Sequence, residues 1–294
     1  MKKTPFDQDF LNKLNRLSLA SKMAVKGSTG GQRKSNLKGD SVEFSDFKEY
    51  TPGDDFRRID WNAYARFERL FIKLFMEEQQ SQITIILDCS GSMDFGDPNK
   101  GFLAKQLAGI FCYLGLNTLD RVGLLCINDK VEDRLPYFTG KQGFWKALKF
   151  IEEIPFGGRT SLNTAIKMCQ SIGSRGGTTI ILSDLFSQDG YEEGIKYLQY
   201  QKQEISLIHI LSPEELDPPW DGNIRLVDKE DQNYRDINVT QQVMRAYRDT
   251  LDGFLRDVRE FCYNRGVHYV PINSGTGIEG IVFDNLVKMG VISS

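Results

Sequence analysis

Oxygen-bearing side chains follow a strongly apolar segment in the first third of the chain. Residues 83–87, ITIIL, are β-branched or aliphatic, which predicts a buried central strand. Asp88 ends this strand, and Ser90 and Ser92 follow at alternate positions in a glycine-containing loop. Ligands of open α/β sheets bind beyond the carboxyl ends of the strands, where this loop lies. A carboxylate and two hydroxyls at that edge predict a site for a hard cation such as Mg²⁺.

Two later loops add matching oxygen ligands. Thr160 lies in the glycine-rich segment GGRTSLNT, just before a predicted helix, and Asp184 ends a second apolar strand, TTIILSD. We therefore expect one metal site, built from three loops at one edge of the sheet. Its expected ligands are Asp88, Ser90, Ser92, Thr160 and Asp184. The structural alternative is that the hydroxyls only cap helices and that the two Asp residues only end strands.

This ligand set resembles the metal-ion-dependent adhesion site of von Willebrand factor type A domains, in which an Asp-x-Ser-x-Ser loop, a Thr and an Asp surround one Mg²⁺. The resemblance implies hydroxyl ligands at Ser90, Ser92 and Thr160, with Asp88 and Asp184 binding the ion directly or through water. Two carboxylates balance a dication, so the ion keeps its affinity for one more oxygen, such as a partner's acidic side chain. Mg²⁺ is the expected cofactor, with Mn²⁺ or Ca²⁺ as alternatives.

The surroundings of the predicted site favour recognition without catalysis. Asp94 and Arg159 flank it, and we expect them to influence which partner binds. Hydrolysis would also need a general base beside a metal-bound water. The histidines, His209 and His268, fall in apolar strands, and we interpret both as core residues. A metal-assisted phosphatase or hydrolase is the main alternative, although Ser90 stands where an Asp-x-Asp nucleophile motif has its second Asp.

Composition and charge limit the classes of protein that fit. The 294-residue chain has no apolar run near 18 residues and begins without the apolar core of a signal peptide. Its five cysteines are never spaced as CxxC, which predicts reduced thiols and a cytoplasmic location. Residues 1–39 carry nine Lys or Arg against two Asp, a charge near +7. A nucleic-acid-binding arm is therefore a third alternative, although no nucleic-acid-binding motif accompanies it.

The order of the predicted elements defines the fold class. Alternating strands and helices over residues 81–212 and 241–294 predict a doubly wound, mostly parallel α/β sheet of the type A or Rossmann-like kind. An antiparallel edge strand is expected at 130–137. A β-hairpin insertion, residues 213–240, interrupts the pattern. Residues 1–80 are expected to hold the basic arm and a small β-rich subdomain, against which the hairpin packs.

Two helices have recognisable starts. Asp97 is expected to cap a helix with Pro98 at its first position, and Thr240 is expected to cap a long amphipathic helix that ends at Gly266. The apolar positions of the long helix recur at helical spacing, which predicts one buried stripe. That stripe comprises Val243, Tyr247, Leu251, Phe254, Val258 and Phe261.

A second diagnostic block, VEFSDFKEYTPGDDFRRIDWNAYAR, spans residues 42–66. It closely resembles the hallmark of the bacterial family called domain of unknown function 58, and EELDPP at 214–219 and RLVD at 225–228 extend the resemblance. By analogy, residues 41–50 and 67–75 are strands, although the second segment also fits a helix. Members of this family are often encoded beside MoxR-type AAA+ ATPases. The resemblance implies a non-enzymatic adaptor whose partner is a MoxR-type ATPase or a client protein presented to it.

Overall fold

The computed structural model describes residues 12–14, 18–19, 42–52, 54–77, 81–169, 176–227 and 233–293. The chain divides into two compact units, one made of residues 1–21 with 82–294 and the other of residues 22–81. Most of the basic segment predicted at 1–39 lies outside the described residues. Among the helices of the described ranges, none has both the length and the apolar character needed to cross a membrane.

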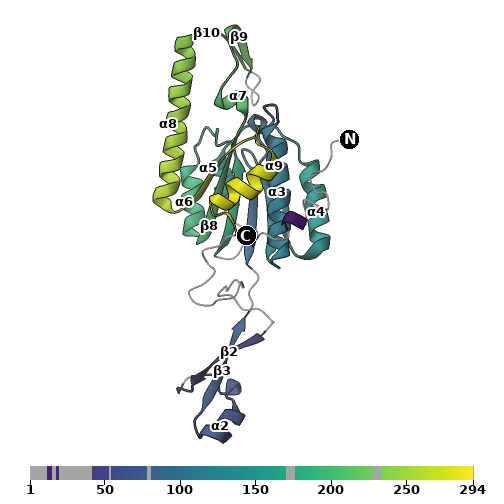
Figure 1. Cartoon of the computed structure of the whole chain (residues 1–294), viewed down its shortest axis with the longest axis vertical. Coiled ribbons are helices and arrows are strands. Elements are labelled where there is room, and N and C mark those ends of the chain that lie inside the picture. Colours follow the sequence, from purple (N-terminus) through teal and green to yellow (C-terminus); the bar gives the residue numbers. More distant parts are fainter. Residues whose placement is uncertain are drawn as a thin grey trace. The chain divides into compact units, whose positions relative to one another are not determined.

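A six-stranded sheet forms the centre of the first unit (Figure 1). In spatial order its strands are β11 (His268–Asn273), β8 (Gln203–Leu211), β7 (Gly177–Ser183), β4 (Gln82–Asp88), β5 (Arg121–Ile127) and β6 (Val131–Phe138). All neighbouring pairs are parallel except β5 and β6. The predicted mostly parallel sheet with one antiparallel edge strand is therefore confirmed.

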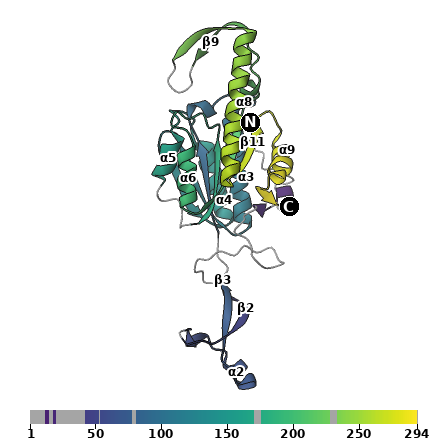
Figure 2. The same cartoon turned by 90° about the vertical axis from the view of Figure 1, so that its left-hand side faces the viewer.

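Helices cover both faces of this sheet (Figures 1 and 2). Because side chains alternate along a strand, Ile85 of β4 packs into the core on one face and Ile86 into the core on the other. The first face is covered by α3 (Lys100–Asn117), α4 (Gly140–Glu153), α9 (Ile278–Gly280) and the π-helical η3 (Ile281–Leu286). The second is covered by α5 (Leu162–Met168), α6 (Glu192–Tyr200) and α8 (Gln241–Arg265). A short pair, β1 (Ser18–Leu19) with β12 (Ile292–Ser293), joins the two ends of this unit.

The predicted hairpin and long helix are both present. β9 (Gly222–Val227) pairs antiparallel with β10 (Tyr234–Val239), and α8 follows with Thr240 as its N-cap and Gly266 as its left-handed C-cap. The predicted buried stripe is wrong at its first member, because Val243 is 41% exposed. The first half of α8 extends beyond the sheet beside the hairpin (Figures 1 and 2), so this half of the helix does not pack against the sheet.

The predicted start of α3 is also wrong. The N-cap is Asn99, whose side chain accepts a hydrogen bond from the backbone N–H of Phe102 at 2.8 Å. Asp97 and Pro98 lie before the helix and are joined by a cis peptide bond. Asp97 instead donates its backbone N–H to Glu214 Oε1 at 3.0 Å. Glu214 lies on the short helix α7 (Pro213–Leu216).

The second unit is a small hairpin with helical turns between its strands. β2 (Val42–Glu49) and β3 (Phe71–Glu77) pair antiparallel; the family resemblance implied both strands, although the second begins four residues later than expected because residue 67 ends α2. Between them lie η1 (Phe56–Arg58) and α2 (Trp61–Phe67), a helix that the sequence patterns did not predict. Asp60 caps α2 by accepting the backbone N–H groups of Asn62 and Ala63, which explains why the helix begins where it does.

Candidate functional site

The predicted ligands lie on three loops beside the carboxyl ends of β4 and β7. Asp88 is the last residue of β4, and a short 3₁₀ turn, η2 (Gly91–Met93), shapes the loop that carries Ser90 and Ser92. Asp184 directly follows β7, the neighbour of β4 in the sheet. Thr160 comes just before α5. The topology therefore brings the two carboxylates to one edge of the sheet.

Hydrogen bonds hold these loops together. The backbone N–H of Gly157 donates to the carbonyl of Cys89 at 2.8 Å, and that of Gly91 donates to the carbonyl of Gly158 at 3.0 Å. The hydroxyl of Ser187, in the loop after β7, donates to the carbonyl of Thr160 at 3.5 Å. The Asp88, Thr160 and Asp184 loops are thus in direct contact, which is the geometry that a shared site requires.

Asp88 is fully buried and accepts hydrogen bonds at both carboxylate oxygens. Its Oδ1 accepts the backbone N–H of Ser90 at 3.0 Å, and its Oδ2 accepts the hydroxyl of Ser183 at 2.6 Å. Burial, with the nearby Asp184 carboxylate as the second cause, raises the pKa of Asp88 to about 6 despite these bonds. A negative charge at this position is therefore costly unless a cation accompanies it.

The raised pKa of Asp88 predicts how stability depends on pH when no divalent ion is present. A carboxyl whose folded pKa exceeds its unfolded value stabilises the fold fully below about pH 4, and this contribution is lost as pH rises through about 6. We expect the Tm in EDTA to fall by roughly 3 °C between pH 5 and 7 from this group alone. Thermal unfolding followed by circular dichroism measures it. Asp88→Asn is the control, because it lacks the titrating group; an equal fall in that variant would contradict the assignment.

The serine hydroxyls are spaced as neighbouring ligands of one ion. The Oγ atoms of Ser90 and Ser92 are 3.1 Å apart. Two ligands at a right angle around Mg²⁺, each about 2.0–2.1 Å from the ion, lie about 3 Å from each other. Ser90 and Thr160 are buried, Ser92 is half-buried, and Asp94 and Arg159 are exposed. The site therefore has ordered hydroxyls at its base and charged side chains at its rim.

Asp184 is also fully buried, but its partners differ from those of Asp88. Its Oδ1 accepts the backbone N–H of Phe186 at 3.0 Å, and its Oδ2 accepts the ammonium of Lys100 at 2.7 Å. The side chain of Lys100 is itself 0% exposed and also donates to Glu215 Oε1 at 2.5 Å. Lys100 and Glu215 are site residues that the sequence analysis missed.

His209 confirms the interpretation of a core histidine. Its Nε2 donates to the backbone carbonyl of Asp184 at 2.9 Å, so its Nδ1 accepts the hydroxyl of Tyr269 at 2.9 Å in the neutral ring. Burial lowers the pKa of His209 to about 4, which keeps the ring neutral. One ring nitrogen thus bonds the backbone of Asp184, and the other bonds the side chain of Tyr269 on β11. His268, at the start of β11, is half-buried and not a full core residue.

The donor set suits an oxygen-preferring ion. Within the described ranges, no three side chains of the types His, Cys, Asp and Glu converge as a metal site of those residues alone would need. The loops offer two carboxylates and hydroxyl groups instead, a set that fits Mg²⁺ and not zinc or copper. Cys89 points into the apolar core as a buried free thiol and leaves the oxygen ligands undisturbed.

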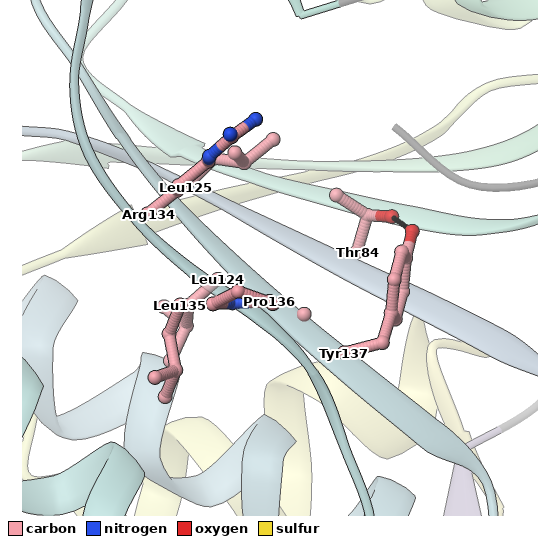
Figure 3. A pocket seen from close by; sticks show the side chains of 8 residues that line it. Thr84, Leu124, Leu125, Arg134, Leu135, Pro136 and Tyr137 are labelled. Carbon is pink, nitrogen blue, oxygen red and sulfur yellow. Dashed lines mark hydrogen bonds between the residues drawn. The ribbon is translucent and has the colours of Figure 1, made fainter. Parts of the chain in front are cut away.

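A cavity of about 270 Å³ lies elsewhere, on β5 and β6 (Figure 3). Arg134 and Tyr137 line it, and the hydroxyl of Tyr137 is 2.5 Å from that of Thr84 on β4. None of the predicted metal ligands is among its lining residues. The candidate site is therefore the set of loops at the sheet edge, with most of its ligands buried, and not this cavity.

Comparison with protein families identifies a family to which the chain is similar. The family model described as "Protein of unknown function DUF58" matches residues 46–252, more than half of the chain. The "Uncharacterized protein Rv1480" of Mycobacterium tuberculosis is 27% identical over 231 residues, which is 77% of this chain and 73% of that protein. The "Uncharacterized protein Mb1516" of Mycobacterium bovis matches to the same extent.

Solved structures with similar folds have low sequence identity. The crystal structure of the conserved hypothetical protein BatB from Bacteroides thetaiotaomicron covers 71% of this chain and 98% of its own, with a TM-score of 0.43 and 17% identity. A von Willebrand factor type A structure from Catenulispora acidiphila covers 87% of this chain and 52% of its own, with a TM-score of 0.40 and 13% identity.

Proposed function

The chain belongs to the DUF58 family of proteins of unknown function, and from that premise we propose that it is a Mg²⁺-dependent protein-binding module. The contact between the Asp88, Thr160 and Asp184 loops is the observation that carries this proposal. The 3.1 Å spacing of the Ser90 and Ser92 hydroxyls supports it, because adjacent Mg²⁺ ligands need that spacing.

Each ligand residue has a distinct role in the proposed site. Ser90 and Ser92 supply neutral oxygens, and Thr160 supplies a third from the adjoining loop. Asp88 and Asp184 supply the negative charge that balances a dication. Bound Mg²⁺ would offer a coordination position to one external carboxylate. Because the hydroxyls add no charge, the site keeps its attraction for an acidic side chain of a partner.

The partner we propose is a MoxR-type AAA+ ATPase, or a client protein presented to one, that contributes an acidic residue. This choice is supported by the resemblance of residues 50–61, YTPGDDFRRIDW, to the hallmark of a family whose members are often encoded beside such ATPases. Asp94 and Arg159 are exposed at the rim of the site, where a bound protein would meet them. The chain itself is proposed to catalyse no reaction, in keeping with a neutral His209 whose ring nitrogens both have partners.

Replacing Ser92 by alanine should greatly weaken Mg²⁺-dependent capture of the partner. The change removes one ligand oxygen from a half-buried position, so the fold should be little affected. A pull-down from a bacterial lysate in Mg²⁺ and in EDTA, with MoxR-type ATPases identified by mass spectrometry, measures the effect. Thr250→Ala removes an exposed hydroxyl on α8 and serves as the control. Equal capture in Mg²⁺ and EDTA by the unaltered protein would count against the proposed function.

A further inference from the structure

A fully buried lysine lies beside the candidate metal site. Lys100, the first residue of α3, bonds Asp184 at 2.7 Å and Glu215 at 2.5 Å, and its ammonium lies 5.3 Å from the centre of the Phe186 ring. A buried ammonium is costly unless it is paired and hydrogen-bonded. The two carboxylates satisfy that need. Lys100 therefore adds a fixed positive charge directly to one of the proposed ligands.

Glu215 is held in place independently of Lys100. Its Oε2 accepts the backbone N–H of Ser212 at 2.7 Å, while its own backbone N–H donates to the hydroxyl of Ser212 at 3.2 Å, which forms a capping box on α7. Its backbone carbonyl accepts the hydroxyl of Tyr247 on α8 at 2.7 Å. The side chain is 13% exposed. The Glu215 carboxylate is thus a negative charge held at a fixed position, and Lys100 links it to Asp184 by hydrogen bonds.

The charges around the site have a simple sum. Asp88, Asp184 and Glu215 each carry one negative charge when ionised, and Lys100 carries one positive charge, which leaves a net charge of −2. One Mg²⁺ would make the cluster neutral. Without Glu215 the sum would be −1, and without Lys100 it would be −3. Buried charges a few ångströms apart interact strongly, so either change should alter affinity for a cation.

We infer that Lys100 and Glu215 form a charge-balancing pair that sets the cation affinity of the site, although neither residue is a metal ligand. Lys100 weakens cation binding by repelling the ion and by occupying Asp184 Oδ2. Glu215 strengthens it by drawing Lys100 away from Asp184. This inference rests on the proposed function and assigns a role to the EELDPP segment, which carries Glu215 on α7.

The test is isothermal titration of the full-length protein with Mg²⁺, and with Mn²⁺ as a second probe. Lys100→Met should tighten binding roughly tenfold, and Glu215→Gln should weaken it roughly tenfold. The double variant restores a net charge of −2 and should bind within about threefold of the unaltered protein. Glu214→Gln is the matched control, because the neighbouring carboxylate on α7 accepts the backbone N–H of Asp97 and does not contact Lys100. Its effect should be clearly smaller.

The outcomes separate this inference from the proposed function. If the unaltered protein binds Mg²⁺ but both single variants bind more weakly, Lys100 is a structural support and the inference is overturned. If Glu214→Gln weakens binding as much as Glu215→Gln, only the general charge of α7 matters and the pair has no special role. If the unaltered protein binds no Mg²⁺, both ideas fail together. Should Lys100→Met not fold, shown by circular dichroism, the comparison of Glu215→Gln with Glu214→Gln decides.

Discussion

Asp88→Asn is expected to abolish Mg²⁺ binding and, at the same time, to make the ion-free protein more stable at neutral pH. The variant removes the buried Asp88 carboxylate, and burial and the Asp184 carboxylate raise the pKa of this group to about 6. At pH 7 this raised pKa makes the ionised Asp88 destabilise the ion-free fold by about 2–3 kcal/mol, and Asn removes that cost. Loss of one of the two carboxylates of the proposed site should reduce Mg²⁺ affinity by more than about 100-fold, since changes in residues that only support a metal ligand already cost 10–100-fold.

The hydrogen bonds of Asp88 permit this substitution. The carbonyl oxygen of the asparagine can accept the backbone N–H of Ser90, and its NH₂ group can donate to Ser183, whose hydroxyl is free to rotate. Urea unfolding in EDTA measures the stability, and calorimetric titration measures the Mg²⁺ affinity. A variant that is both less stable and still able to bind Mg²⁺ would show that Asp88 only ends its strand.

The sequence patterns located the Asp88 and Asp184 loops because the relevant signals are local. The apolar run that ends in Asp88 predicts a strand and its last residue, and the run before Asp184 predicts a strand that ends one residue earlier, at Ser183. Parallel pairing of those strands then places both carboxylates at one edge. The Thr160 loop connects α4 with α5 and follows no strand of the sheet, so strand pairing alone does not place it beside the Asp88 loop; backbone hydrogen bonds show that contact.

The role of Lys100 and Glu215 could not be read from local patterns. A lysine at the start of a helix is ordinarily solvent-exposed, and its burial depends on Asp184 and Glu215, which lie 84 and 115 residues further along the chain. The hydrophobic pattern of α3 predicts neither Asp184 nor Glu215 as a partner of Lys100. The only sequence signal was the EELDPP segment, which the family resemblance marked without giving a reason. Helix α2 is a different case, because its start signal is local: Asp60, its N-cap, directly precedes Trp61, and no helix was predicted from it.

Asp184→Ala is expected to have the opposite effect on stability from Asp88→Asn. It removes one of two carboxylates that neutralise the fully buried Lys100. Removing one partner of a buried ion pair commonly costs 3–5 kcal/mol, and the lower end, about 3 kcal/mol, applies here because Glu215 still holds the ammonium. Urea unfolding of the ion-free protein at pH 7 measures the loss. Asp94→Ala, which removes an exposed carboxylate from the Asp88 loop, is the control and should cost less than about 1 kcal/mol.

The difference between the two aspartates follows from their partners. Asp88 is surrounded by neutral donors and by the Asp184 carboxylate, so none of the described residues forms an ion pair with it and its charge is available to a metal ion. Asp184 is already paired with Lys100, so its charge also supports the fold. Loss of partner binding in Asp184→Ala would therefore mix two effects, whereas loss in Asp88→Asn would report on the ion alone. If Asp184→Ala cost no more than Asp94→Ala, the Lys100 pair would contribute nothing to stability, and this distinction between the two residues would be wrong.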